Sequence, residues 1–199
     1  FDTHTHLNDA AFWHDVAAYW ARAREYRVVE MNVVGYDTVG NQRAIEIAHE
    51  FEGVHAIVGW QPGESGDFKP EDMATLRELA DPGVVGIGEM GLDYYWEENP
   101  TSDIQKAVFK AQLDLAREFH KPVTIHTREA TADTYEVLKD ANVAEFGGVM
   151  HSFTGTAEEA KQFLDLGMYI SFSGIATFKN AKDVHETLKS VPLDRLLVE

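Results

Sequence analysis

The feature that most constrains the fold of this chain is a regular alternation of short apolar segments with amphipathic ones. The apolar segments predict strands at residues 1–7, 28–34, 54–60, 84–89, 122–126, 147–151, 168–172 and 195–199. The amphipathic segments predict helices at 14–26, 37–51, 69–80, 102–119, 130–140, 156–166 and 181–190. One strand–helix unit takes roughly 25–30 residues, which is the repeat of the α/β class (β/α)8 TIM barrel.

An open, doubly wound parallel sheet is the alternative architecture, because it uses the same alternation. No linker, low-complexity tract or shift in composition divides the chain, so we expect a single domain over residues 1–199. The last predicted strand ends with the chain at Glu199, where a closing helix would follow in a complete barrel. We therefore expect the C-terminal part of the barrel to be missing from this chain.

The charge of the chain limits its partners. It has 34 acidic and 17 basic residues among 199, a formal net charge of −17. Proteins that hold long nucleic acids by neutralising phosphates are basic, and anionic membranes also attract basic surfaces. No apolar run approaches the roughly 20 residues of a transmembrane helix. The absence of cysteine excludes disulfides and thiolate metal sites. We expect a cytoplasmic protein without a membrane partner.

Histidines and a glutamate recur at the predicted strand ends, where a parallel barrel carries its functional residues. His4 and His6 are two positions apart, so they point to one face of the first strand. Glu89, His126 and His151 end the fourth, fifth and sixth predicted strands. A lone histidine pair is often only solvated or part of a core, but the repetition at four strand ends favours a metal site.

Four histidines and one carboxylate exceed the three protein ligands of a typical catalytic zinc ion. The surplus indicates two divalent ions about 3.5–4 Å apart, bridged by a carboxylate. Glu89 is the candidate bridge, because each of its oxygens can bind one ion. Two such ions activate a water molecule and stabilise charge on the group under attack.

At these residues the sequence resembles the TatD family of metal-dependent deoxyribonucleases, which belong to the amidohydrolase-type barrels. Five motifs carry the resemblance, in family order along the chain: Asp2-Thr3-His4-Thr5-His6-Leu7, Gly88-Glu89-Met90-Gly91-Leu92-Asp93-Tyr94, His126-Thr127-Arg128-Glu129-Ala130, His151-Ser152-Phe153-Thr154-Gly155 and Ser171-Phe172-Ser173-Gly174. Bridging by Glu89, without a lysine nearby, favours this branch over relatives that bridge their metals with a carboxylated lysine.

The resemblance implies hydrolysis of DNA from a 3′ end, with single-stranded or frayed ends as substrate. It implies a hydrolase dependent on two divalent metal ions, magnesium first, with zinc, manganese or nickel as alternatives. Carried over by position, the metal ligands are His4, His6, Glu89, His126 and His151. Glu199 matches the glutamate of a Glu-Thr-Asp motif whose aspartate would lie two residues further along. We expect a monomer.

Two flanking residues have competing interpretations. Arg128 lies two residues past His126, where it would either bind a phosphate oxygen in the catalytic site or form a structural salt bridge on the rim. Asp93 would either orient a metal ligand or cap a turn.

Aromatic residues also cluster in the predicted mouth loops. Tyr94, Tyr95, Trp96 and Phe153 would stack on a terminal base or serve only packing.

Two other functions stay open at this point. One is metal-dependent hydrolysis of a small ester, lactone or amide, and the other is a non-catalytic barrel with a vestigial site that acts as a binding protein. The intact set of five ligands argues against the second.

Overall fold

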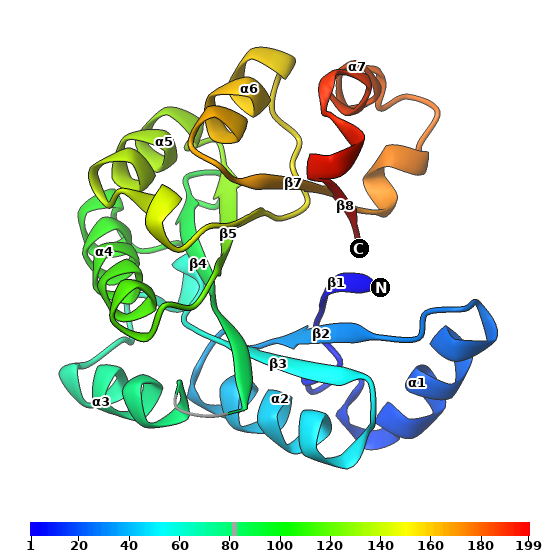
Figure 1. The fold of residues 1–199 in the computed structure, drawn as a ribbon. Helices are drawn as coiled ribbons and strands as arrows, with labels where there is room; N and C mark the ends of the chain where they lie inside the picture. Colours follow the sequence, from blue (N-terminus) through cyan, green and yellow to red (C-terminus); the bar gives the residue numbers. More distant parts are fainter. Residues whose placement is uncertain (81–82) are drawn as a thin grey trace.

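The chain folds into eight parallel strands surrounded by helices, in a nearly closed (β/α)8 barrel (Figure 1). This architecture comes from a computed structural model, which describes residues 1–80 and 83–199. Each strand pairs with the next one in the sequence, from β1 to β8, and every pair is parallel. This order confirms the barrel and excludes the doubly wound alternative, in which the strand order reverses.

The observed elements fall where the alternation predicted them. The strands are β1 Asp2–Thr5, β2 Met31–Val34, β3 Val54–Val58, β4 Val84–Asp93, β5 Val123–Arg128, β6 Gly148–Met150, β7 Tyr169–Phe172 and β8 Leu196–Val198. The α-helices are α1 Val16–Glu25, α2 Thr38–Glu50, α3 Pro70–Leu79, α4 Ser102–Phe119, α5 Thr131–Asp140, α6 Ala157–Asp165 and α7 Lys182–Ser190. Short 3-10 helices not predicted from the sequence are η1 Trp13–Asp15, η2 Pro62–Glu64, η3 Val143–Glu145, η4 Gly174–Thr177 and η5 Leu193–Arg195.

Strand β4 is longer than its sequence indicated. It was expected to end at Glu89 but continues to Asp93, and its last residues pair with β5, Gly91 opposite His126 and Asp93 opposite Arg128. Glycine is unfavourable in strands, and Gly91 therefore favours a strand end near Glu89. Cross-strand pairing overrides that preference, and it holds Asp93 directly beside β5.

Local signals in the sequence account for several helix starts. The Asp37 carboxylate accepts from Gly40 N at 2.6 Å and caps α2. Thr156 and Glu159 form a reciprocal capping box at the start of α6. Pro70 occupies the first turn of α3, where its missing N–H has no partner to lose.

The hydrophobic core joins the strands to the surrounding helices. Phe109 and Leu113 of α4 are fully buried in the same cluster as Ile87 and Leu92 of β4 and Ile125 of β5. The burial of residues i and i+4 on α4 follows from the 3.6-residue helical period. This packing fixes the ends of β4 and β5, which carry three of the predicted site residues.

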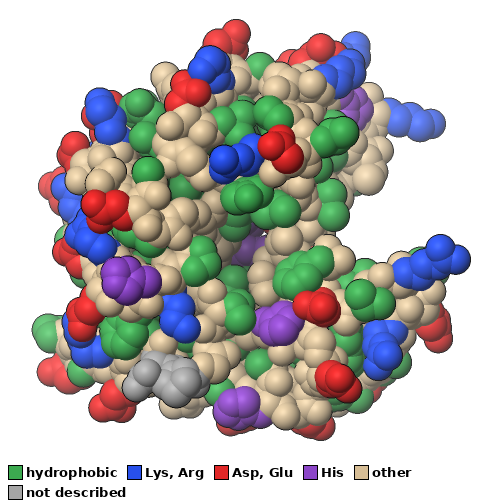
Figure 2. Space-filling view, viewed as in Figure 1, with side chains coloured by type: hydrophobic (Ala, Val, Ile, Leu, Met, Phe, Trp, Pro, Cys, Tyr) green, Lys and Arg blue, Asp and Glu red, His purple; other side chains and the backbone are tan. Residues whose placement is uncertain are grey.

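The seam between the first and last strands is the least regular part of the barrel. Thr3 Oγ1 donates to the Val198 carbonyl at 3.0 Å across it. All four residues of β1 are half-buried. The outline of the molecule is indented beside this seam, between α1 and α7 (Figure 2).

The surface carries its charges in a mixed pattern. On the face visible in Figure 2, acidic and basic side chains alternate and form no continuous basic stripe. No helix within residues 1–80 and 83–199 has the length and apolar character needed to cross a bilayer.

Candidate metal centre

All five side chains predicted to bind metal lie together at one end of the barrel. His4 is in β1, Glu89 in β4 and His126 in β5, while His6 and His151 directly follow β1 and β6. Each histidine has a ring nitrogen within 3.5 Å of a Glu89 oxygen. The structure therefore brings together residues that are up to 147 positions apart (151 − 4), and their role as metal ligands remains a prediction.

Glu89 is buried, and its two oxygens face different histidine pairs. Oε2 lies 3.5 Å from His4 Nε2 and 3.3 Å from His6 Nε2. Oε1 lies 3.0 Å from both His126 Nδ1 and His151 Nε2. One oxygen for each pair of imidazoles is the arrangement expected of a carboxylate that bridges two cations.

The opposite ring nitrogen of each histidine is held by a protein group. The partners are the Val34 carbonyl for His6 Nδ1 (2.9 Å), Asp93 Oδ2 for His126 Nε2 (2.9 Å), Glu199 Oε1 for His151 Nδ1 (3.4 Å) and Thr124 Oγ1 for His4 Nδ1 (3.3 Å). A neutral imidazole that donates outward presents a lone pair on its other nitrogen. With all four imidazoles neutral, as metal ligands are, four lone pairs would face Glu89.

The spacing of these nitrogens fits metal coordination. His4 Nε2 lies 3.1 Å from His6 Nε2, and His126 Nδ1 lies 3.3 Å from His151 Nε2. Ligand atoms about 2.1 Å from one ion are about 3.0–3.4 Å apart, in octahedral and tetrahedral geometry respectively. Lone pairs and carboxylate oxygens repel one another at this distance unless a proton or a metal ion lies between them. The donor set of imidazole and carboxylate suits a divalent metal ion.

The buried charges shift the acidities of the cluster in opposite directions. Burial lowers the pKa of His4 to about 4, and the neighbouring His151 contributes in the same direction. Burial also lowers the pKa of His151, but the charges and hydrogen bonds of Glu89 and Glu199 outweigh it and raise that pKa to about 10. Burial raises the pKa of Glu89, yet His151 and His126 hold it well below its usual range.

Glu199 is part of the cluster although it was not among the predicted ligands. Its Oε1 accepts from His151 Nδ1, and Ser171 Oγ donates to its Oε2. Glu199, His151 and His4 also present ligand atoms within 4.8 Å of one another. The resemblance to a Glu-Thr-Asp motif singled out this residue, and the structure gives it a definite contact with a predicted ligand.

Asp93 has both of the roles that the sequence left open, a contact to a predicted metal ligand and a turn cap. Its Oδ2 accepts from His126 Nε2, and its Oδ1 accepts from Tyr95 N at 3.0 Å. Burial raises its pKa, but the hydrogen bond from His126 outweighs burial, so the net pKa is lowered. Asp93 thus orients a predicted ligand and also caps the turn.

Arg128 lies at the end of β5, exposed, outside the cluster of predicted ligands. Its Cζ is 3.6 Å from the centre of the Tyr95 ring and 5.3 Å from that of Trp96. No ion pair in the described part of the chain includes Arg128, so the salt-bridge interpretation was wrong. A guanidinium stacked on an aromatic face keeps its N–H edge free to bind an anion.

The four mouth aromatics divide into two groups. Tyr95 and Trp96 are 44% and 47% exposed, so both rings have faces in contact with solvent. Phe153 is buried against Phe163, and the Tyr94 hydroxyl donates to Asp133 Oδ2 at 2.8 Å. Base stacking thus remains a hypothesis for Tyr95 and Trp96, whereas Phe153 serves packing.

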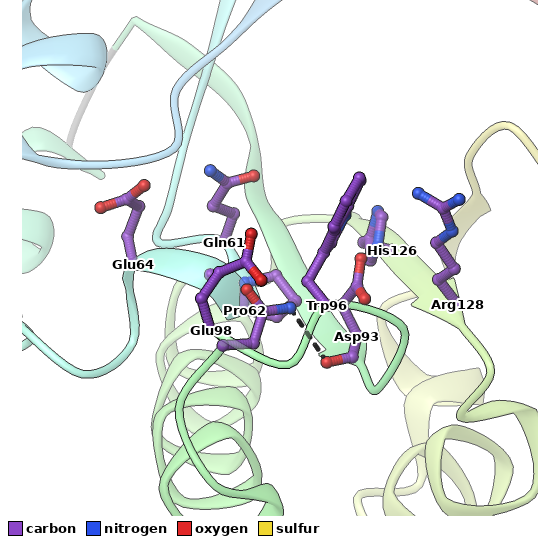
Figure 3. A pocket seen from close by; sticks show the side chains of 10 residues that line it. Gln61, Pro62, Glu64, Asp93, Trp96, Glu98, His126 and Arg128 are labelled. Atoms are coloured by element: carbon purple, nitrogen blue, oxygen red, sulfur yellow. Dashed lines mark hydrogen bonds and ion pairs between the residues drawn. The ribbon is translucent and has the colours of Figure 1, made fainter.

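A pocket of about 450 Å³ adjoins the cluster (Figure 3). Its walls are residues 61–64 after β3, Trp96, Glu98 and Asn99 in the β4–α4 loop, and Asp93, His126 and Arg128. No sequence pattern indicates Gln61, Glu64, Glu98 or Asn99, because they lie in loops without a recognisable spacing. Only the fold shows that the loop after β3 and the β4–α4 loop face each other.

A parallel barrel with clustered histidines around a buried glutamate at one end is typical of a class, the metal-dependent hydrolases of the barrel type. Comparison with known proteins narrows the class. The family model of the TatD related DNases matches residues 1–199. This chain belongs to the TatD family of metal-dependent hydrolases.

Individual relatives agree with that assignment. The chain is 44% identical over 200 residues to the uncharacterized metal-dependent hydrolase YabD of Bacillus subtilis (strain 168), matching 100% of this chain and 78% of YabD. It is 33% identical to the 3′-5′ ssDNA/RNA exonuclease TatD of Klebsiella pneumoniae (strain 342), over 100% of this chain and 76% of the relative. The crystal structure of YjjV, a TatD homolog from Escherichia coli K12, superposes with a TM-score of 0.93 at 27% identity, covering 100% of this chain and 77% of YjjV.

Proposed function

We propose that this protein hydrolyses phosphodiester bonds at the 3′ ends of single-stranded or frayed DNA with two divalent metal ions. The observation that carries the proposal is the position of Glu89, with one oxygen toward each of two histidine pairs. A relative 33% identical to this chain is named a 3′-5′ ssDNA/RNA exonuclease, which supports nucleic acid as the substrate. Magnesium is the first candidate, with zinc, manganese or nickel as alternatives.

The metal centre divides into two proposed sites that share Glu89. His4 and His6 would hold one ion, and His126 and His151 the other. When bound, the two ions supply Lewis-acid activation of water and neutralise charge on the phosphate. The protein contributes fixed geometry, because Asp93 and the Val34 carbonyl lock the orientations of His126 and His6.

Arg128 is proposed to bind the substrate phosphate. Tyr95 stacks on its guanidinium, and no carboxylate in the described chain lies within ion-pair distance of it. Arg128 lines the same pocket as the predicted ligand His126. A phosphate oxygen near the metals is therefore within reach of a planar donor suited to bidentate contact.

The overall negative charge of −17 supports a substrate held at its end. A protein that grips many phosphates needs a basic surface, and its affinity falls steeply with salt. Contacts limited to the metals and Arg128 would give a shallow salt dependence. A slope that implied six or so phosphate contacts would contradict this part of the proposal.

The test measures digestion of end-labelled single-stranded DNA with and without divalent metal ions. It compares the parent protein with its Glu89→Gln variant. The amide keeps the shape of the side chain but removes the negative charge of the carboxylate that is proposed to bridge the two metal ions. We expect activity to fall by at least about 10²–10³-fold and the bound metal to fall below two ions per chain. A variant as active as the parent protein would refute the role of Glu89.

A matched control is Glu30→Gln, which changes an exposed glutamate paired with His55 outside the cluster. It should keep both activity and metal content. If the parent protein spares DNA but hydrolyses a panel of small esters, lactones or amides, the same centre acts on another substrate. If it retains less than one ion per chain after metal loading, the barrel is a binding protein with a vestigial site.

A further inference from the structure

The pocket beside the metal centre, which we call the rim pocket, continues the site rather than standing apart from it. Asp93 and His126 belong to both, since His126 Nδ1 faces Glu89 and its other nitrogen donates to Asp93. A substrate group in the rim pocket therefore lies next to the bond that the metals would attack. The inference that follows rests on the proposed nuclease function.

The charge of the rim pocket decides which part of a nucleotide it accepts. Glu64 and Glu98 bring two carboxylates to its walls, on the side away from Arg128 (Figure 3). Carboxylates repel a phosphodiester, so that wall does not suit the nucleic acid backbone. The neutral base of a nucleotide does not meet this repulsion.

The shape of the rim pocket suits a planar ring. Trp96 is 47% exposed and stands in Figure 3 between Glu98 and Gln61 on one side and His126 and Arg128 on the other. A base stacks on such a ring at a gain of about 1–3 kcal/mol, whatever its sequence. The volume of about 450 Å³ lies in the range of small-molecule sites.

The charged polar groups on one wall of the rim pocket are acceptors only. The carboxylates of Glu64 and Glu98 have no proton to donate when ionised. The neutral donors of the lining are the Gln61 amide, the Trp96 indole N–H and the Asn99 amide, which already donates one of its two N–H groups to the Asp93 carbonyl at 3.1 Å. A ligand group that faces Glu64 or Glu98 must therefore donate hydrogen bonds.

We propose that the rim pocket holds a nucleobase next to the scissile phosphate and selects bases that carry an exocyclic amino group. Cytosine presents an N4 amino donor where uracil presents an O4 acceptor, and carboxylates bind the former. An acceptor facing Glu64 or Glu98 leaves both groups desolvated without a hydrogen bond. The protein should accordingly favour cytosine over uracil beside the cleaved bond.

The experiment compares kcat/KM for short 5′-labelled oligomers of deoxycytidine and of deoxyuridine, with the manganese-loaded protein. Homopolymers place the same base on both sides of the scissile phosphate, so the result is independent of which neighbour occupies the pocket. We expect a preference of at least about fivefold for the deoxycytidine oligomer. The double variant E64Q/E98Q, whose amides both donate and accept, should reduce the preference below about twofold.

The matched control is Glu97→Gln, because Glu97 is exposed, adjacent to Glu98 and not part of the rim pocket. It should retain the full preference. Circular dichroism and metal content of E64Q/E98Q should equal those of the parent protein, so that a lost preference reports on recognition and not on folding.

The outcomes separate this inference from the function on which it rests. Equal cleavage of both oligomers by the parent protein, or a preference that survives in E64Q/E98Q, overturns the rim pocket as a base-selecting site. If neither oligomer is cut, the nuclease proposal fails. In that case the affinities of dCMP and dUMP, measured by calorimetry, test the rim pocket alone. Tighter binding of dCMP supports its base-selecting role, and equal affinity overturns that role.

Discussion

Two opposing effects act on the charge of Glu89. Burial of a carboxylate is unfavourable, and it acts to raise the pKa of Glu89. His151, His126 and His4 outweigh that cost, and metal ions bound to these histidines would favour the charged carboxylate too. Because Glu89 is buried, removal of its histidine partners would leave its charge without compensation, which is a large loss.

Asp93→Asn should weaken metal binding without abolishing it. The carboxylate that accepts from His126 Nε2 becomes an amide, so the orientation and basicity of that imidazole are less well fixed. Loss of such an outer partner typically costs about 10–100-fold in metal affinity. Metal titration followed by calorimetry measures the change.

The control for this prediction is Asp67→Asn, a change of the same chemistry at an exposed position outside the rim pocket. It should bind metal as the parent protein does. An unchanged affinity in Asp93→Asn would show that His126 is not a ligand or does not need its partner.

Arg128→Lys should raise KM for DNA by about tenfold and leave metal content unchanged. Lysine keeps the charge but loses both the flat stack on Tyr95 and the bidentate donor edge. Steady-state kinetics on single strands would show the effect. The control is Arg24→Lys, because Arg24 on α1 also stacks on an aromatic ring, with its Cζ 5.8 Å from the centre of the Trp20 ring. This variant should leave KM unchanged. If Arg128→Lys has the KM of the parent protein, Arg128 does not bind the substrate phosphate.

At the scale of an element, β4 depends on glycines where it passes β5. Gly91 has φ +145°, and a Cβ there would lie 1.9 Å from the His126 carbonyl oxygen. Gly88 has φ +140°, with Thr124 O 2.5 Å from a Cβ at that position. These close approaches let the strand carry Glu89 between the two histidine pairs, so the glycines are required by backbone packing.

Gly91→Ala should lower the free energy of unfolding by more than about 3 kcal/mol, because a side chain there adds a backbone clash to an unfavourable φ. Gly167→Ala is the matched comparison. Gly167 has φ +83° with nothing within 4 Å of a Cβ, so it tests the φ term alone, about 1–2 kcal/mol. Urea unfolding curves give both values, and equal losses would refute the clash at Gly91.

At the scale of the whole molecule, strands distant in sequence create a cluster in which proton binding is linked to the predicted metal binding. His151 gains its raised pKa of about 10 from Glu89 on β4 and from Glu199, which follows β8. In the metal-free protein, protonation of His151 stabilises the folded state. This contribution is fully present below pH 6.5 and is lost as the pH rises through about 10. A metal ion on His151 Nε2 must displace that proton.

Metal affinity should therefore rise with pH, by up to about tenfold per unit below pH 10 for one displaced proton. Calorimetric titration at pH 8 in two buffers of different ionisation enthalpy should report about one proton released. His151→Gln should release less. A release near zero in the parent protein would mean that His151 is neutral before the metal binds, or that it does not bind metal.

Much of the fold could be predicted from the sequence because its signals are local. The alternation of apolar and amphipathic segments predicted the eight strands and seven α-helices that the described part of the chain contains. The start of α2 agrees with the predicted range because Asp37 is a favourable N-cap. The end of β4 was missed, since Gly91 looks like a turn residue until its pairing with His126 is known. The 3-10 helices carry too few residues for a periodic pattern.

What the sequence alone determined is the set of chemical groups at the strand ends, because parallel strands of a barrel all place their carboxyl ends on one rim. Only the tertiary structure decided how Glu89 divides its oxygens between two histidine pairs and that Asp93 meets His126. It also decided that Arg128 stacks on Tyr95 and that Glu64 and Glu98 share a pocket. These contacts join loops and strands without a common sequence period, so their distances follow from barrel closure and side-chain packing.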